Sequence, residues 1–213
     1  MQIAERVYSL AQGQDDPILK IWAYKVLACT LYFLGDFETS GQNAVHGVRI
    51  WRSGNVQALP EDVDTPNVSC LKQVALSEWH LGEIASCQAT IAEAISIAKQ
   101  LKEKHALALA LSWAAGLAAN EPNPAEVDRL ASELIELSTR HNFAHWLATG
   151  AIYRGWARSA SGDAAEGISW IEQGLIDLRA TGAMLVLPPH LAFKAEALHL
   201  ARPRLRPARC RGL

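Results

Sequence analysis

A glycine-bearing corner recurs between stretches of helical periodicity, and it limits what this 213-residue chain can fold into more than any other feature. It occurs as Leu34-Gly35-Asp36-Phe37, Leu81-Gly82-Glu83-Ile84 and Ser161-Gly162-Asp163-Ala164. The glycines lie 47 and then 80 residues apart, which fits a repeat of roughly 40 residues with a less regular copy in the middle. The pattern predicts a stack of helical hairpins, so we expect function on a binding surface rather than at a catalytic pocket.

Composition places the chain among soluble globular proteins. Half of the residues are hydrophobic, and no run of about 18 apolar residues predicts a membrane span. The N-terminal segment is amphipathic and charged, unlike a signal peptide, so we expect a cytoplasmic protein that does not bind membranes. The four cysteines have no C-x-x-C spacing and are expected to fill small spaces in the core; they are Cys29, Cys70, Cys87 and Cys210.

The formal net charge of −2 is unevenly distributed along the chain. Residues 202–213 hold five arginines and no acid, so the remaining chain is more acidic than the total suggests. We expect that acidic body to repel nucleic acid. The Arg/Pro-rich tail has no apolar period and is predicted to be a disordered, solvated end.

Hydrophobic periodicity and helix-start signals predict an all-α chain. Asp16-Pro17 and Thr65-Pro66 each supply an N-cap followed by a first-turn proline, and Asn123-Pro124-Ala125-Glu126 reads as a capping box. The predicted helices span residues 2–10, 17–34, 37–51, 66–79, 84–101, 105–119, 124–137, 143–160, 165–181 and 188–201.

The domain organisation follows from these helices. Residues 1–201 are predicted to form one repeat domain of about four antiparallel hairpins with an unpaired helix at each end, arranged as a right-handed superhelical solenoid. The longest irregular connection runs from Arg52 to Thr65. Because both end helices lack a partner in the pattern, we expect the chain to be a piece of a longer array, from a truncated or frame-disrupted gene.

The small residues around each corner resemble those of tetratricopeptide repeats (TPR). With each corner glycine at the connecting position, three pairs fall at the close-packing positions of the first and second helices: Ala28 and Ser40, Ala75 and Cys87, and Gly155 and Gly167. The pattern departs at Glu78 and Arg158, where it prefers an aromatic residue or leucine. The third hairpin lacks the corner glycine, and the spacing exceeds the usual 34 residues.

Several separated motifs resemble, in order, the C-terminal helical region of large bacterial signal-transduction ATPase regulators of the maltose-activator class. They are Leu31-Tyr32-Phe33-Leu34-Gly35-Asp36-Phe37, Thr65-Pro66-Asn67-Val68-Ser69-Cys70-Leu71, Trp79-His80-Leu81-Gly82, Trp146-Leu147, Arg154-Gly155-Trp156-Ala157, Gly174-Leu175 and Arg179-Ala180-Thr181-Gly182-Ala183. The resemblance implies a sensor or docking platform beside a sibling ATPase, nucleotide cyclase or DNA-binding domain.

Catalytic and metal-binding motifs are not evident. No G-x-x-x-x-G-K-[ST] phosphate loop occurs, so we expect neither ATP hydrolysis nor a cofactor. His141 and His145 are four residues apart, but a helix junction falls between them and no third ligand is near in sequence. His80 and Glu83 could form an acid-base pair, yet a solvated surface pair is the commoner arrangement. We therefore predict a protein that is not an enzyme.

Tryptophans supply the candidate binding surface. Trp51 and Trp113 sit among apolar neighbours and are predicted to be packing residues, whereas Trp22, Trp79 and Trp156 are candidates for contact with a partner. In the tetratricopeptide register, six residues fall on the first-helix face that lines the concave groove: Trp22, Lys25, Tyr32, Lys72, Trp79 and His80. An aromatic and basic groove suits an acidic or aromatic peptide, or a planar ligand.

Three functions remain open at this stage. The leading prediction is a non-catalytic module that binds a protein, a peptide or a sibling domain in a bacterial signalling regulator. A second is a small-molecule sensor, with the ligand between the groove and the 52–65 connection, which would need an apolar pocket with a few converging polar groups. A third is the remnant of a cyclase or ATPase without its catalytic domain.

Overall fold

The computed structural model describes residues 1–54, 65–121 and 123–201, which form ten α-helices and no β-strand. The predicted Arg/Pro-rich tail, Cys210 and most of the 52–65 connection lie outside these residues. The helices are α1 (Gln2–Gln12), α2 (Pro17–Phe33), α3 (Phe37–Arg52), α4 (Pro66–His80), α5 (Ile84–Leu101), α6 (Lys104–Ala119), α7 (Pro124–His141), α8 (Ala144–Ala160), α9 (Ala164–Ala180) and α10 (Leu187–Leu200).

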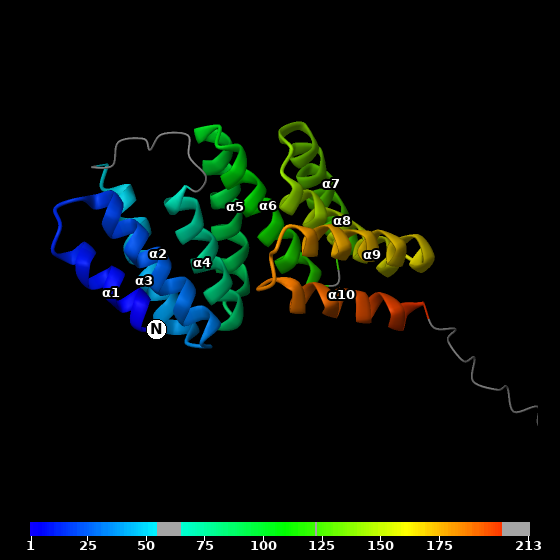
Figure 1. Ribbon diagram of the computed structural model, residues 1–213, viewed down its shortest axis with the longest axis horizontal. Helices are drawn as coiled ribbons and strands as arrows, with labels where there is room; N and C mark the ends of the chain where they lie inside the picture. The colour runs from blue at the N-terminus through cyan, green and yellow to red at the C-terminus, as the bar shows by residue number, and fades with distance from the viewer. Residues whose placement is uncertain (55–64, 122, 202–213) are drawn as a thin grey trace, which may run out of the picture.

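Four helical hairpins follow one another along the molecule, as predicted (Figure 1). They pair α2 with α3, α4 with α5, α6 with α7, and α8 with α9. The first helices of successive hairpins also contact one another, so that α2, α4, α6, α8 and α10 form one inner row. The chain therefore has the all-α superhelical arrangement that the repeat pattern predicts.

Glycines at the corners make the sharp turns possible. Gly35, Gly82 and Gly162 have φ values of +85°, +81° and +106°, a left-handed backbone conformation that other residues rarely adopt. Asp36 then caps α3 by accepting a hydrogen bond from a backbone N–H three residues later, at 3.1 Å. Asp163 caps α9 in the same way, at 3.3 Å. Turn and helix start are thus encoded by adjacent residues.

The predicted helix starts are correct in position, but their caps differ. The Asp16 carboxylate accepts hydrogen bonds from the N–H groups of Ile18 and Leu19 at 2.8 and 3.3 Å, so this cap is confirmed. Thr65 occupies the N-cap position of α4 but makes no side-chain cap bond, which corrects that part of the prediction.

The capping box at α7 is half formed. Asn123 Oδ1 accepts from the N–H of Glu126 at 3.2 Å, as predicted. The return bond is replaced, because the Asn123 N–H donates to the carbonyl of Glu121 at 2.7 Å. The Glu126 carboxylate turns instead to the Arg129 guanidinium, which donates two hydrogen bonds of 2.8 and 2.6 Å. A charged, bidentate partner outcompetes a neutral backbone donor here.

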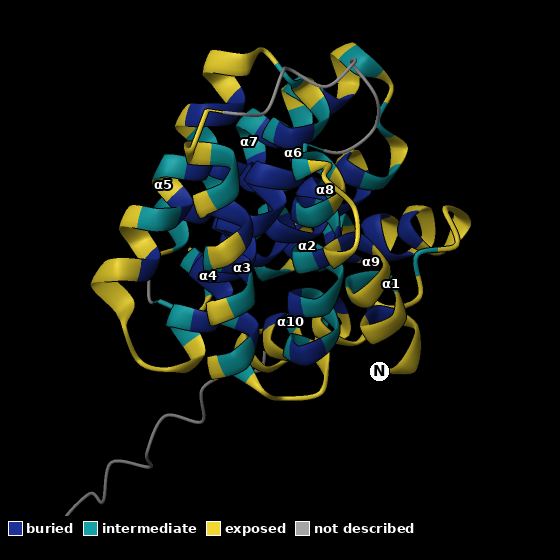
Figure 2. Cartoon of the chain, turned by 90° about the vertical axis from the view of Figure 1, so that its left-hand side faces the viewer, coloured by how far each residue is buried: buried dark blue, intermediate teal, exposed yellow. Residues whose placement is uncertain are grey.

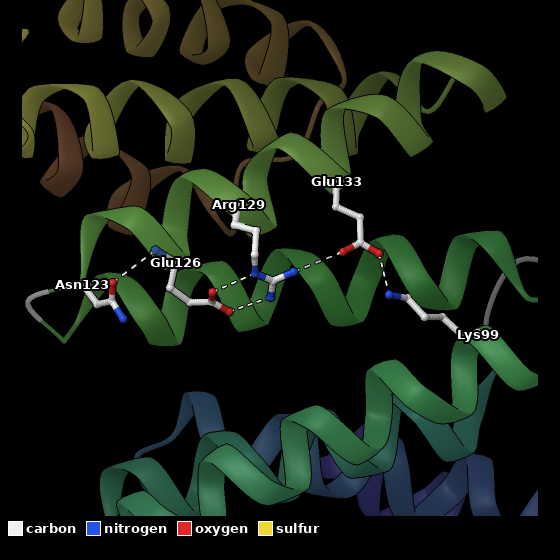
Figure 3. A network of polar contacts seen from close by, with 5 residues as sticks. All are labelled: Lys99, Asn123, Glu126, Arg129 and Glu133. Carbon is white, nitrogen blue, oxygen red and sulfur yellow. Dashed lines mark hydrogen bonds and ion pairs between the residues drawn. The ribbon is translucent and has the colours of Figure 1, made fainter.

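The same carboxylate starts a chain of ion pairs that links two hairpins (Figure 3). Its bonds with Arg129 lower the pKa of Glu126. Arg129 also lies 3.6 Å from Glu133, and the other oxygen of Glu133 pairs with Lys99 of α5 at 2.7 Å. All of these groups are partly exposed, so the network adds little to stability.

Small residues allow the helices of each hairpin to approach closely, at the positions that the sequence predicts. Ala28, Ser40 and Ala75 are fully buried, and Cys87 is almost so. Ser40 Oγ donates a hydrogen bond of 2.8 Å across the first hairpin to the carbonyl of Ala28. In the fourth hairpin, Gly155 and Gly167 are buried at the equivalent places.

The end helices each pack on one side only. α1 contacts α2, and α10 contacts both α8 and α9. The far side of α1 carries Ile3 and Leu10, which are 81% and 64% exposed, and α10 exposes Leu198 and Leu200. The buried residues lie between the helices, with exposed residues on the outer surface (Figure 2).

Replacing Gly155 with alanine tests the close approach of α8 and α9. A Cβ at this position would lie 2.5 Å from the carbonyl oxygen of Gly167 and 2.8 Å from Cγ1 of Ile171. Because the first contact is with backbone, the helices must separate, and we expect a loss of about 1–3 kcal/mol in unfolding free energy by urea titration. Gly13→Ala is the matched control, since its nearest atom would be 3.7 Å away. Equal stability of the two variants would contradict the packing.

Candidate functional site

The inner row of helices lines a partly open cavity of about 490 Å³, which we call the inner cavity. Its walls come from all five helices of the row, α2, α4, α6, α8 and α10, and from the α9–α10 connection. On each helix the lining residues recur at intervals of three or four, so that each helix presents one face. The lining is mostly aromatic and aliphatic, with a few polar groups.

A buried amine lies on the α4 face of the cavity. The Lys72 side chain is only 9% exposed, and its Nζ donates to Gln73 Oε1 at 3.0 Å. The same Nζ lies 5.1 Å from the ring centre of Trp113, a cation-π distance. Gln73 Nε2 in turn donates to Ser40 Oγ at 3.2 Å. The cation is therefore held in place by a hydrogen-bond chain that runs into the core of the first hairpin.

Histidine and tyrosine meet near the corner of the second hairpin, at the edge of the cavity. His80 Nε2 lies 3.0 Å from the hydroxyl of Tyr32, and the His80 ring stacks on Phe37 with centroids 4.1 Å apart. Burial lowers the pKa of His80. These contacts, rather than one with Glu83, fix the His80 ring.

The opposite wall is built by aromatic residues of α6, α8 and α10. Trp146 Nε1 donates to His105 Nε2 at 3.2 Å, and Tyr153 packs edge to face on Phe193 with centroids 5.4 Å apart. A Cβ on Gly116 would lie 2.7 Å from the Tyr153 hydroxyl, so the glycine gives this phenol room against α6. Burial raises the pKa of Tyr153 far above its ordinary value.

Two further histidines lie in this wall. Burial lowers the pKa of His145, and the nearby His190 and His105 lower it further. Burial also lowers the pKa of His190, while a hydrogen bond to the Val186 carbonyl opposes part of that effect. Both rings are consequently neutral at pH 7, and the cavity gains no positive charge from them.

Four of the six predicted groove residues line the inner cavity: Tyr32, Lys72, Trp79 and His80. Trp22 and Lys25 are not among the lining residues; the Lys25 amine instead sits 4.3 Å over the Trp22 ring. Lys25 precedes Tyr32 by seven residues, so it shares a helical stripe with Tyr32 but lies roughly 10 Å further along the axis. The cavity lies at the C-terminal end of α2.

Other aromatic residues were misassigned or missed. Trp113 packs on the core as predicted, but it also lines the cavity. Trp51 is a packing residue, as expected. Trp156 is 4% exposed and donates from Nε1 to Glu196 at 2.8 Å, so it belongs to the core rather than to the cavity. Trp146 drew attention only through the family resemblance, and it too lines the cavity.

Other sequence candidates do not form sites in the described part of the chain. No group of three or more potential metal ligands occurs there. His141 ends α7 and stacks on Phe143, which confirms the predicted helix junction. Of the cysteines, Cys70 and Cys87 are buried, whereas Cys29 is half-buried and lines the cavity, which corrects its assignment to the core. None of the described helices is both long and apolar enough to span a bilayer.

Comparisons with known proteins identify the fold and leave the function open. No protein-family model matches the chain. A Rhizobium meliloti (strain 1021) protein described as "Uncharacterized protein R02095" is 26% identical over 131 residues, which cover 62% of this chain but 13% of that protein. The crystal structure of BtubC (BKLC) from P. vanneervenii resembles this chain with a TM-score of 0.65 and 15% identity, covering 97% of this chain and 94% of that one.

The neutral histidines predict a stability that falls in mild acid. In the unfolded chain the pKa of these histidines is about 6.5, and in the folded chain it is lower. As the pH drops below 6.5, the unfolded state therefore binds more protons than the folded state, and the free energy of unfolding decreases. We expect the urea midpoint to be lower at pH 5.5 than at pH 7.5. His190→Gln should reduce this difference, because it removes one contributing group. An equal or higher midpoint at pH 5.5 in the unmodified chain would contradict the prediction.

Proposed function

We propose that this chain is a non-catalytic recognition module whose inner cavity receives anchor side chains from a peptide segment of a partner protein. The observation that carries the proposal is the cavity itself: about 490 Å³, mostly apolar, and lined from every helix of the inner row. Pockets of this kind, lined by aromatic rings on rigid elements, are where the anchor residues of protein interfaces bind.

The ordered polar contacts around the cavity favour binding over chemistry. The Lys72 amine is held by Gln73, and His80 is held by Tyr32 and Phe37. Burial raises the pKa of Tyr153, which keeps its hydroxyl protonated and a poor nucleophile. We infer that these groups orient a bound segment.

A small-molecule effector is the second candidate function. The cavity volume lies within the range of roughly 300–1,000 Å³ that is typical of small-molecule sites, and its lining has the apolar character with few polar groups that such sites show. The sequence predicts such a ligand between the groove and the 52–65 connection; four of the groove residues line this cavity, and most of the connection lies outside the described residues. Isothermal titration with nucleotides and small sugars distinguishes this function, because peptide recognition predicts no heat with either.

The setting of the module is also a proposal. The R. meliloti relative is far longer than the matched region, which supports a role as one segment of a larger protein. The resemblance to signal-transduction ATPase regulators adds a sibling ATPase or cyclase domain as the possible source of the bound segment. A remnant of such an enzyme would keep this recognition role.

Tryptophan variants test the cavity as the peptide site. Peptides selected on the full chain from a random phage-displayed library provide the probe. We expect Trp113→Ala to weaken their binding about tenfold or more in fluorescence titrations, because a buried aromatic contact is lost. Trp79→Ala should have a similar effect. Trp22→Ala is the matched control and should leave affinity unchanged, since Trp22 pairs with Lys25 away from the cavity. Circular dichroism checks that helicity is retained.

The opposite pattern would overturn the site assignment. If Trp22→Ala weakens peptide binding while the correctly folded Trp113→Ala and Trp79→Ala variants bind normally, the partner occupies the N-terminal end of α2 and not the inner cavity.

A further inference from the structure

Three histidines near the cavity differ in the hydrogen-bond partners of their Nε2 atoms. Nε2 of His80 is engaged by the Tyr32 hydroxyl, and Nε2 of His105 accepts from the Trp146 indole. Nε2 of His190 is buried and has no hydrogen-bond partner among the described residues. His190 lines the cavity and is only 5% exposed. This nitrogen therefore needs a partner that the described structure does not supply.

The chemical form of that nitrogen follows from the other side of the ring. His190 Nδ1 lies 2.5 Å from the Val186 carbonyl oxygen, which can only accept, so Nδ1 carries the proton. Burial lowers the pKa of the ring and keeps it neutral at pH 7. In this tautomer Nε2 holds a lone pair and is a hydrogen-bond acceptor.

The neighbouring side chains do not meet this need. The Tyr153 ring is tilted against His190 with centroids 5.5 Å apart, but its hydroxyl lies beside Gly116 on α6. That hydroxyl also interacts with Ser112, another α6 residue, which offsets part of the rise in its pKa. Phe193 covers a further side of the His190 ring and offers no donor. Leaving a buried acceptor unpaired is costly, and a bound ligand with a donor would remove that cost.

We propose that the cavity selects a tyrosine or tryptophan side chain of the partner peptide, whose O–H or N–H donates to Nε2 of His190 when binding uncovers this buried nitrogen. This inference rests on the proposed peptide-binding function and specifies the anchor residue. The bound ring lies among Trp113, Trp146 and Phe193, where aromatic contacts prefer edge-to-face and offset geometry.

Other donor side chains fit the same surroundings less well. Lysine or arginine would have to bury its charge in a cavity whose described lining residues include no acid. Serine or threonine could reach the nitrogen but would make few contacts with the aromatic lining. Phenylalanine would make those ring contacts and leave the acceptor unpaired. An aromatic ring that ends in a neutral donor suits both the ring lining and the nitrogen.

Paired side-chain analogues test the inference on the full chain. p-Cresol and toluene differ by the phenol hydroxyl, and 1,3-dimethylindole carries an N-methyl group in place of the N–H of 3-methylindole. Affinities are measured by quenching of tryptophan fluorescence and by saturation-transfer NMR. We expect the p-cresol to toluene affinity ratio, and likewise the indole ratio, to fall about threefold to tenfold in His190→Phe relative to the unmodified chain.

Two controls separate the lost acceptor from a general disturbance. His46→Phe is the matched substitution, because His46 stacks on Tyr24 away from the inner cavity, and it should leave both ratios unchanged. His190→Gln places an amide near the Nε2 position and should restore part of the preference. In the unmodified chain, the ¹⁵N resonance of His190 Nε2 should move upfield with p-cresol but not with toluene. This measurement does not depend on the folding of any variant.

The outcomes distinguish this inference from the proposed function. If the analogues bind in the cavity, and Trp113→Ala weakens them, but His190→Phe leaves the ratios unchanged and the Nε2 resonance does not move, the donor inference is wrong while the cavity remains the site. If library peptides bind the chain but neither those peptides nor the analogues respond to Trp113→Ala, the cavity is not the peptide site and both proposals fail.

Discussion

Small residues let the two helices of the fourth hairpin, α8 and α9, approach closely, and this approach positions one wall of the inner cavity. In α8, Gly155 faces α9, while Tyr153, two residues earlier and so on the opposite side of the helix, faces the cavity. Pressing the small face against the partner helix leaves the large aromatic face free to build a wall. A larger residue at Gly155 would push α8 away from α9 and shift that wall.

Local chemistry explains why most of the fold could be predicted. Apolar periodicity, prolines in first turns and left-handed corner glycines act within a few residues, so the sequence places most helix bounds to within two residues, although α7 runs to His141 and not to the predicted residue 137. The failures occur where a competitor is not local to the motif. The α7 box predicted from Asn123 and Glu126 is half formed because Glu126 pairs with Arg129, which itself is bound to Glu133 and through it to α5. A four-residue sequence motif contains no information about such a network.

The candidate site was only partly predictable from the sequence. Helical periodicity shows which residues share a face of a helix, but not which part of that face borders the cavity. Tyr32 and Lys25 share a face of α2, yet only Tyr32 reaches the cavity. Trp113 could not be assigned to one role from the sequence, because α6 is apolar almost all round. Its ring both packs on the core and lines the cavity. No sequence motif pointed to His190. Its role depends on a backbone carbonyl in the α9–α10 connection, which fixes the tautomer of the ring.

The polar groups of the cavity divide it into two ends with opposite demands on a ligand. On α4, the Lys72 amine is held by Gln73, which is anchored through Ser40 to the first hairpin, so a ligand meets a fixed cation. On α10, Nε2 of His190 is a neutral acceptor walled by rings. An apolar cavity discriminates only weakly between ligands of slightly different size. It discriminates strongly against a ligand that leaves a buried polar group of the cavity unpaired. Discrimination between aromatic side chains of similar size therefore comes from the α10 end, while the rings between the two ends supply affinity without selecting among them.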